Sequence, residues 1–221
     1  MEELRAYEMF DTEHTAAKEL LQSVTYPWEA LPLIGQWIVE LAAKLPAGEY
    51  EEVSDKVWIA KSAKIYPNTT IMGPTIIGSG TEVRPGAFIR GNALVGENCV
   101  VGNSTELKNV ILFDNVQVPH YNYVGDSILG YKAHMGAGAV TSNVKQDKSL
   151  ISVNKAGERV ETGLKKFGAM LGDHAEIGCN SVLNPGSIIG RGSRVYPLSM
   201  VRGFVPPNSI HKNDDSIVPV R

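Results

Sequence analysis

The sequence predicts a mainly β fold in which the chain winds as a parallel β-helix with three flat faces. The first observation behind this prediction is a six-residue repeat, in which an aliphatic residue returns at Ile59, Ile65, Ile71, Ile77, Val83, Ile89, Val95, Val101 and Leu107. The second is that the residue four places after each of the first eight is Ala, Thr or Cys. A later run repeats the pattern at Leu171, Ile177, Leu183, Ile189, Val195 and Val201. A period of six fits neither a 3.6-residue helix nor continuous strand alternation, so each hexad is expected to form one short strand and one corner.

Three hexads complete one coil of such a helix, so residues about 18 apart in the sequence are expected to stack. The aliphatic residue fills the interior, and the small residue, Cys99 among them, lets the chain turn close to the axis. Stacked coils are joined by backbone hydrogen bonds at the parallel-sheet spacing of roughly 4.8 Å. Each end of the stack needs a covering segment.

The repeat divides the chain into three regions. Residues 1–50 lie outside it and predict helices over 12–24 and 27–45, the second bent or divided by Pro32, which would cover the first coil. Residues 51–205 form the β-helix, and 206–221 form a polar C-terminal tail. The register breaks near 114–120, resumes at Tyr123, and breaks again over 142–166, where two alternating stretches predict a hairpin. Loops that interrupt a rigid scaffold commonly carry functional sites.

Composition excludes several classes of partner. The 221 residues are 43% hydrophobic and 20% charged, with a formal net charge of −3. This near-neutral balance offers no surface for nucleic acid, and no apolar run is long enough to span a membrane. The first residues lack the basic and apolar regions of a signal peptide, and two cysteines, Cys99 and Cys179, are too few for a disulfide framework. We therefore expect a cytoplasmic protein with neither structural metal nor membrane or nucleic-acid partners.

Three segments carry motifs that the hexad repeat does not demand: GNSTELKNVIL at 102–112, HYNYVGDSILGYKAHMGAGAVTSN at 120–143 and KFGAMLGDHAEIGCNSVLNPG at 166–186. On these segments, residues 57–205 resemble the left-handed β-helix acyltransferases with hexapeptide repeats. Within that family the chain is most similar to the C-terminal acetyltransferase domain of the bifunctional glucosamine-1-phosphate acetyltransferase and N-acetylglucosamine-1-phosphate uridyltransferase (UDP-N-acetylglucosamine pyrophosphorylase). The resemblance implies a left-handed β-helix, a homotrimer, and acetyl-CoA bound as co-substrate between neighbouring subunits.

The resemblance also implies roles for individual residues. Transfer of acetyl from a thioester to a sugar amine needs a base for the ammonium proton, and an imidazole suits that task. The family's catalytic histidine matches His120, and its substrate-contacting tyrosine matches Tyr123. The lysine and the arginine with which the family binds the sugar phosphate match Lys108 and Arg90. Arg90 lies one coil before Lys108, so the two side chains should stack on the same face. Arg84 is the second choice for the arginine, because it lies six residues outside the coil register.

Other matched positions depart from the family pattern. A further substrate contact falls on His134, where the family has asparagine, and another falls on Asn143, which also fits a turn cap at the mouth of the hairpin. Cofactor contacts are implied at Ala137, Gly138, Lys166 and Cys179, with backbone N–H groups of the Gly136–Gly138 stretch as oxyanion donors.

Together these residues predict an acetyl-CoA-dependent N-acetyltransferase acting on an amino sugar phosphate or a nucleotide-linked amino sugar. We expect no nucleotidyl transfer, because the sequence lacks the Gly-rich fingerprint of a nucleotidyltransferase domain. One alternative is a non-catalytic trimer that binds a sugar phosphate or sugar nucleotide. Another is a zinc-dependent, carbonic-anhydrase-like enzyme, which the wide spacing of the histidines disfavours: His14, His120, His134, His174 and His211.

Overall fold

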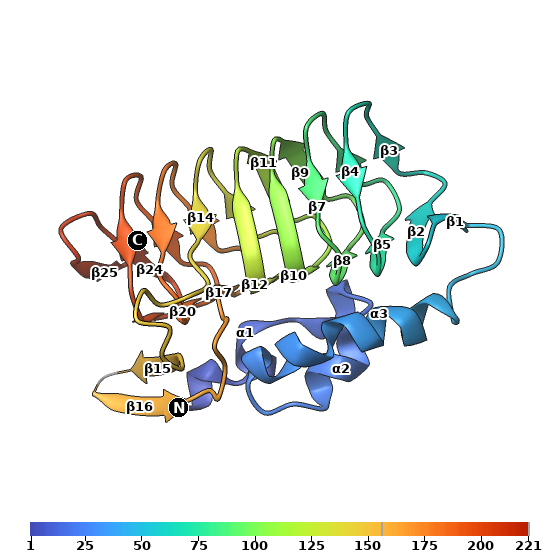
Figure 1. Cartoon of the computed structure of the whole chain (residues 1–221). Coiled ribbons are helices and arrows are strands. Elements are labelled where there is room, and N and C mark those ends of the chain that lie inside the picture. The colour runs from blue at the N-terminus through green and yellow to red at the C-terminus, as the bar shows by residue number, and fades with distance from the viewer. Residues whose placement is uncertain (156, 221) are drawn as a thin grey trace.

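A computed structural model describes residues 1–155 and 157–220, and its main body is a left-handed parallel β-helix flanked by helices and a hairpin (Figure 1). Strands that follow one another around a coil lie on three faces, and strands one coil apart pair in parallel. The predicted fold class is confirmed.

The three faces are built from short strands. Face 1 contains β2 (Val57–Ala60), β5 (Thr75–Ile77), β8 (Ala93–Val95), the later halves of β10 (Glu106–Leu112) and β12 (Tyr123–Leu129), β17 (Ala169–Leu171), β20 (Ser187–Ile189) and β23 (Phe204–Val205). Face 2 contains β3 (Lys64–Ile65), β6 (Glu82–Val83), β9 (Val100–Asn103), β11 (Gln117–His120), β13 (His134–Met135), β18 (Glu176–Ile177), β21 (Arg194–Val195) and β24 (Ser209–His211). Face 3 contains β4 (Thr70–Ile71), β7 (Phe88–Ile89), the first halves of β10 and β12, β14 (Val140–Thr141), β19 (Val182–Leu183) and β22 (Met200–Val201).

The interior of the coils is filled as the repeat predicts. Aliphatic residues of the hexads, such as Ile77, Val95 and Leu107, are fully buried. Small polar residues at the corners bond to the neighbouring coil: the Thr81 hydroxyl donates to the Gly96 carbonyl over 2.8 Å and accepts from the Cys99 N–H over 2.9 Å. Cys99 points inward as expected, and burial raises the pKa of its thiol to about 12, so it stays protonated at neutral pH.

The predicted loop insertion near 114–120 is wrong, because this stretch forms a regular part of the helix. Residues 117–120 are β11, which pairs with β9 and β13 on face 2. The register changes instead at two corners that are one residue shorter, so that Leu112, Val118 and Val124 are the inward residues. Tyr123, predicted to resume the inward series, is consequently half-exposed on the outside of face 3.

Both ends of the stack are closed by antiparallel strands. At the first coil, β1 (Tyr50–Ser54) pairs with β2, and at the last coil β25 (Ile217–Pro219) pairs with β24. The prediction that the coil ends before residue 206 is therefore wrong, since β24 still belongs to face 2. These antiparallel strands pair with backbone N–H and C=O groups that the edge of an open coil would expose.

The N-terminal region contains short helices joined by tight turns: η1 (Glu2–Leu4), α1 (Ala6–Met9), η2 (Thr12–His14), α2 (Lys18–Gln22), η3 (Pro27–Leu33) and α3 (Ile34–Ala42). Pro32 lies in η3, and α3 begins two residues later, so the predicted second helix is divided there. The predicted first helix is also divided, into η2 and α2.

These helices lie along face 1 rather than over the first coil, as Figure 1 shows, which corrects the sequence prediction. The reason is the outward residue of each face 1 strand. It is apolar on six successive coils and is 2% exposed or less, at Ile76, Leu94, Ile111, Ile128, Met170 and Ile188. An apolar outer face needs a covering layer, and the helices supply it.

The segment between β14 and β17 leaves the coil as a hairpin. Its strands, β15 (Ser152–Lys155) and β16 (Glu158–Glu161), are antiparallel, and the chain returns where it left, because the Phe167 N–H donates to the Asn143 carbonyl over 3.0 Å. The hairpin lies on the same side of the β-helix as the N-terminal helices (Figure 1).

Replacing Ile111 with alanine tests the packing of the helices on face 1. The side chain is fully buried at an outward position, so Ile111→Ala should lower the free energy of unfolding by about 2–5 kcal/mol. Val39→Ala, at a 42% exposed position of α3, should cost less than about 1 kcal/mol. Denaturant titration measures both; equal losses would mean that face 1 is not a packed interface.

Candidate active site

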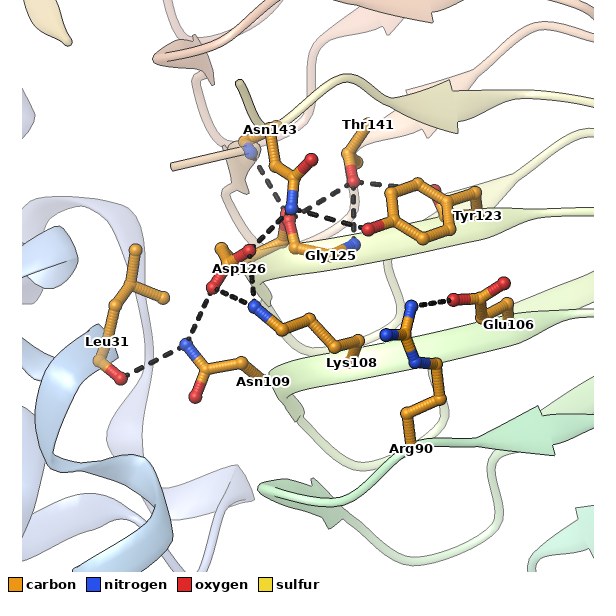
Figure 2. Close-up of polar contacts among 12 residues, drawn as sticks. Leu31, Arg90, Glu106, Lys108, Asn109, Tyr123, Gly125, Asp126, Thr141 and Asn143 are labelled. Carbon is orange, nitrogen blue, oxygen red and sulfur yellow. Dashed lines mark hydrogen bonds and ion pairs between the residues drawn. The ribbon is translucent and has the colours of Figure 1, made fainter. Parts of the chain in front are cut away.

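Polar side chains gather on the outside of face 3, at its corner with face 1 (Figure 2). They come from successive coils, so that stacking brings together residues far apart in the sequence: Arg90, Glu106, Lys108, Asn109, Tyr123, Asp126 and Asn143. We call this set the Asp126 cluster. The predicted stacking of Arg90 beside Lys108 follows from the parallel register of β7 and β10.

Asp126 is at the centre of the cluster and is only 4% exposed. Its Oδ1 accepts hydrogen bonds from Lys108 Nζ at 2.9 Å and from Asn109 Nδ2 at 3.0 Å. Its Oδ2 accepts from Lys108 Nζ at 3.0 Å and from Asn143 Nδ2 at 2.5 Å. A buried carboxylate is tolerated only when it is paired and hydrogen-bonded, and these partners meet that condition. Asp126 therefore fixes the positions of Lys108 and Asn143.

The cluster is also joined to the N-terminal region. The Asn109 amide donates to the Leu31 carbonyl of η3 over 3.2 Å as well as to Asp126. Asn109 and Asp126 occupy the two shortened corners, with φ of 54° and 48°. Asparagine and aspartate adopt this left-handed conformation more readily than most residues do. The change of register thus creates the corners on which these two side chains meet.

Tyr123 lies flat over Gly125, two residues along β12. A Cβ atom on Gly125 would come within 2.5 Å of the Tyr123 hydroxyl, so only glycine leaves room for the ring. The Asn143 amide donates to that hydroxyl over 3.3 Å. Burial raises the pKa of Tyr123, the carboxylates of Asp126 and Glu106 raise it further, and Arg90 partly offsets them. The phenol therefore stays protonated at neutral pH and is able to donate a hydrogen bond.

The two predicted phosphate ligands have different surroundings. The Arg90 guanidinium pairs with Glu106 at 2.7 Å, and both side chains remain partly exposed. Since a guanidinium has five N–H donors, this pair leaves others for a ligand. The Lys108 ammonium is directed at Asp126 and has one N–H beyond the two bonds it donates there. Arg84 lies after β6 on face 2, beside Glu82 at 3.3 Å, and is not part of the cluster.

His120 is exposed at the end of β11, three residues before Tyr123. Within the described residues, no side-chain hydrogen bond joins it to the Asp126 cluster. Its backbone is held on both sides: the N–H donates to Asn122 Oδ1 over 3.1 Å, and the carbonyl accepts from the Gly138 N–H over 3.0 Å. Buried Asn122 in turn donates to the carbonyls of Gly136 and Ala139 over 2.8 and 3.1 Å. The corner that carries His120 is therefore rigidly tied to the next coil.

The predicted oxyanion site at 136–138 is reduced by backbone contacts to a single donor, the Ala137 N–H. The Gly136 N–H donates to the Ile177 carbonyl over 2.7 Å, and the Gly138 N–H donates to the His120 carbonyl. Both donors are used in joining coils, so neither is available to a thioester oxygen; within the described residues no hydrogen bond engages the Ala137 N–H, and the oxyanion prediction stays open at that donor. Ala137 lies between them at the corner of faces 2 and 3, and its carbonyl accepts from the Asn180 N–H over 2.8 Å.

The remaining predicted contacts lie away from the Asp126 cluster. His134 is on β13 of face 2, where its Nδ1 is 2.8 Å from Glu176 Oε2 on the next coil. Cys179 is exposed one coil beyond Gly136, at the corner of faces 2 and 3. Lys166 is exposed where the hairpin rejoins the coil. The structure thus brings Arg90, Lys108, Tyr123 and Asn143 together and separates His134 from them.

Sequence reasoning missed Asp126, Asn109, Asn122 and Glu106 as site residues. Asp126 was within a quoted motif, and its spacing of about one coil from Lys108 was the available signal, although the register sets Lys108 opposite Gly125. Across 1–155 and 157–220, no group of three His, Cys, Asp or Glu side chains is arranged to hold a metal ion. In the same part of the chain, no helix is long and apolar enough to cross a membrane.

Parts of the chain are similar to known proteins. Residues 71–163 match the family described as GMPPB C-terminal domain. The chain is 36% identical over 98 residues to a bifunctional sugar-1-phosphate nucleotidylyltransferase/acetyltransferase of Sulfurisphaera tokodaii, covering 44% of this chain and 24% of that protein. It is 33% identical over 199 residues to the bifunctional protein GlmU of Methanococcus maripaludis, covering 88% of this chain and 48% of that protein.

A third relative is closer in length. The putative uncharacterized acetyltransferase YaiX of Escherichia coli is 27% identical over 156 residues, covering 71% of this chain and 68% of that protein. The chain spans less than half the length of the two bifunctional relatives. The predicted resemblance to the C-terminal region of such bifunctional proteins is confirmed by these matches.

Neutralising Asp126 tests its place at the centre of the cluster. Asp126→Asn leaves the Lys108 ammonium, which is 25% exposed, without a counter-ion, and should lower the free energy of unfolding by about 1–3 kcal/mol. Glu106→Gln breaks the more exposed Arg90 pair and should cost less than about 1 kcal/mol. Denaturant titration compares them, and a cost for Glu106→Gln equal to that for Asp126→Asn would contradict the central role of Asp126.

Adding a methyl group at Gly125 should displace the Tyr123 ring into solvent. Because burial is what chiefly raises the pKa of Tyr123, exposure in Gly125→Ala should lower that pKa toward the ordinary value for tyrosine. The pKa is obtained from tyrosinate absorbance as pH rises, taking the difference between each protein and its Tyr123→Phe counterpart. An unchanged or higher pKa in Gly125→Ala would show that the ring does not depend on this glycine.

Proposed function

We propose that the protein is an acetyl-CoA-dependent N-acetyltransferase whose acceptor is an amino sugar bearing a phosphate, either as the sugar phosphate or in a nucleotide-linked form. The observation that carries this proposal is the Asp126 cluster, in which two cations, a protonated phenol and an amide lie on one corner of a rigid scaffold. The relatives named as acetyltransferases support the reaction class.

The cluster fits the acceptor in the following way. The free donors of Arg90 and the remaining N–H of Lys108 bind the phosphate, and the Tyr123 hydroxyl bonds the sugar. Asp126 holds Lys108 in place, so the ammonium needs little reorganisation when the ligand arrives. The neutral Asn143 amide, held by Asp126 and Tyr123, contributes orientation rather than charge.

His120 is the base in this proposal. Its imidazole takes the proton from the acceptor ammonium, and the amine then attacks the thioester carbonyl to form a tetrahedral adduct. Collapse of the adduct breaks the C–S bond, so that the acetyl group ends on nitrogen and coenzyme A leaves as the thiol. Because a thioester is already activated, most of the acceleration comes from positioning the two reactants. Ala137, Gly138, Cys179 and Lys166 are the proposed cofactor contacts.

A homotrimer is part of the proposal. Val140, Val182 and Met200 are aligned one above another on the outside of face 3, and the last two are 37% and 56% exposed. A single flat face encloses little of a ligand, whereas a groove between two subunits encloses both reactants. The cytoplasmic location stays a prediction from the sequence.

A second candidate function is binding without catalysis. It is favoured by one observation: within the described residues, the His120 side chain has no hydrogen bond that would orient the imidazole as a base. In that case the Asp126 cluster would bind a sugar phosphate or sugar nucleotide and His120 would play no part.

Coenzyme A release distinguishes the two functions. Wild-type protein is assayed with acetyl-CoA against amino sugar 1-phosphates and nucleotide-linked amino sugars. His120→Ala should lower kcat by about 10²- to 10⁴-fold, the usual contribution of a general base. His174→Asn is the matched control: this exposed histidine has φ of 58°, which asparagine tolerates, and activity should stay within about twofold. Acceptor binding without any release would leave the binding function instead.

A further inference from the structure

A cavity of 640 Å³ opens between the β15–β16 hairpin and the last coils. Charged and amide side chains line it, chiefly Lys145, Asp147, Asn154, Arg159, Asn184 and Arg202. Arg90, Lys108, Tyr123 and His120 do not line it, so this cavity is distinct from the Asp126 cluster. The hairpin lies beneath the later coils in Figure 1. Its residues Ser152, Asn154 and Arg159 line one side of the cavity.

The charge of this cavity favours an anion. Lys145, Arg159 and Arg202 are cationic, and Asp147 is the one carboxylate among the described lining residues. Hydrogen bonds from Ser149 lower the pKa of Asp147, so it remains ionised and offsets one of the three cations. Lys145 Nζ donates to the Leu150 carbonyl over 2.8 Å, which keeps two N–H donors for a ligand. Arg159 Nε is 2.5 Å from Glu161, whose carboxylate offsets part of its charge.

Arg202 is the best placed of these cations. It directly follows β22 at the corner of faces 3 and 1, and it is exposed. Within the part of the chain that the structure describes, no carboxylate forms an ion pair with it. Its planar fork of donors suits bidentate recognition of a phosphate group.

The size and remaining lining indicate more than inorganic phosphate. Cavities of roughly 300–1,000 Å³ hold ligands of cofactor size, and this one lies within that range. Val144 and Met200 present exposed apolar surface, 39% and 56%, on which a base could pack. Asn154, Asn184 and Ser152 add hydrogen-bonding groups suited to a base and a ribose. Phosphates, ribose and base together describe a nucleotide.

The position of the cavity separates it from the proposed cofactor contacts. It lies along the same corner of faces 3 and 1 as the Asp126 cluster, and Ser142 and Val144, which flank Asn143, are in its wall. Ala137, Gly138 and Cys179 lie instead at the corner of faces 2 and 3. The hairpin that forms the wall is anchored at the cluster, because the Gly168 N–H donates to the Asp126 carbonyl over 2.8 Å.

We propose that this cavity binds a nucleoside diphosphate other than coenzyme A, with Arg202 and Lys145 on the phosphates and the apolar surface of Val144 and Met200 against the base. The ligand is taken either free or as part of a nucleotide-linked sugar. Whether this nucleotide is part of the acceptor depends on the proposed function. The binding of the nucleotide does not, because binding is measured without acyl transfer.

Calorimetric titration of the full chain with UDP, GDP, dTDP and ADP tests the proposal, with inorganic phosphate and coenzyme A titrated alongside. At least one nucleoside diphosphate should bind more tightly than inorganic phosphate, and prior saturation with coenzyme A should leave that binding unchanged. Arg202→Ala should weaken it by at least about tenfold, the loss expected for a charge-assisted contact to phosphate. His120→Ala should bind as the wild type does, whatever its activity.

Arg194→Ala is the matched control. Arg194 is an exposed arginine on β21 of face 2, away from the cavity, and its loss changes the net charge equally. Binding by Arg194→Ala should equal that of the wild type. The proposal is overturned if no nucleoside diphosphate binds at millimolar concentration, if coenzyme A competes with it, if inorganic phosphate binds as tightly, or if Arg202→Ala and Arg194→Ala behave alike. Unchanged thermal unfolding of Arg202→Ala shows that a loss of binding is not a loss of fold.

Discussion

Parallel stacking of the coils is the constraint on which the rest of the structure depends. Each coil donates its backbone hydrogen bonds to the next one, so a side chain is fixed by its position in the coil and by its neighbours one coil away. Arg90, Lys108 and Asp126 meet for this reason, although they span more than thirty residues. A site built in this way is rigid without a large core, because every member is held by the ladder on both sides.

Departures from strict stacking create the Asp126 cluster. Two corners lose one residue each, and the side chains at those corners, Asn109 and Asp126, turn toward each other. The third departure is the hairpin, which leaves after Asn143 and returns at Phe167, where the Gly168 N–H donates to the Asp126 carbonyl. The buried Asp126 therefore links the coil, the N-terminal helices through Asn109, and the hairpin. Its desolvation is compensated by Lys108 and two amides, which together order the proposed acceptor site.

The sequence could predict much of the fold because the inward residues repeat strictly. It did not predict the position of the helices, although the signal was present: the outward residue of face 1 is apolar on six successive coils, as at Ile76, Leu94 and Ile111. It could not show which N–H groups of the predicted oxyanion stretch are already engaged, since the use of the Gly136 and Gly138 N–H groups within the coil ladder depends on exact register. A shift of one residue decides whether a group faces a ligand or a neighbouring coil.

The sequence by itself determined the coil, its interior and the stacking of Arg90 beside Lys108, because a period of six leaves one way to bury the aliphatic residues. Only the tertiary structure decided which groups those cations meet. Lys108 is paired with Asp126 because two shortened corners move the register, and Arg90 is paired with Glu106 because their coils are adjacent. No apolar residue in the sequence marks a shortened corner. Its effect on which side chains become partners is therefore known only when the coils are stacked.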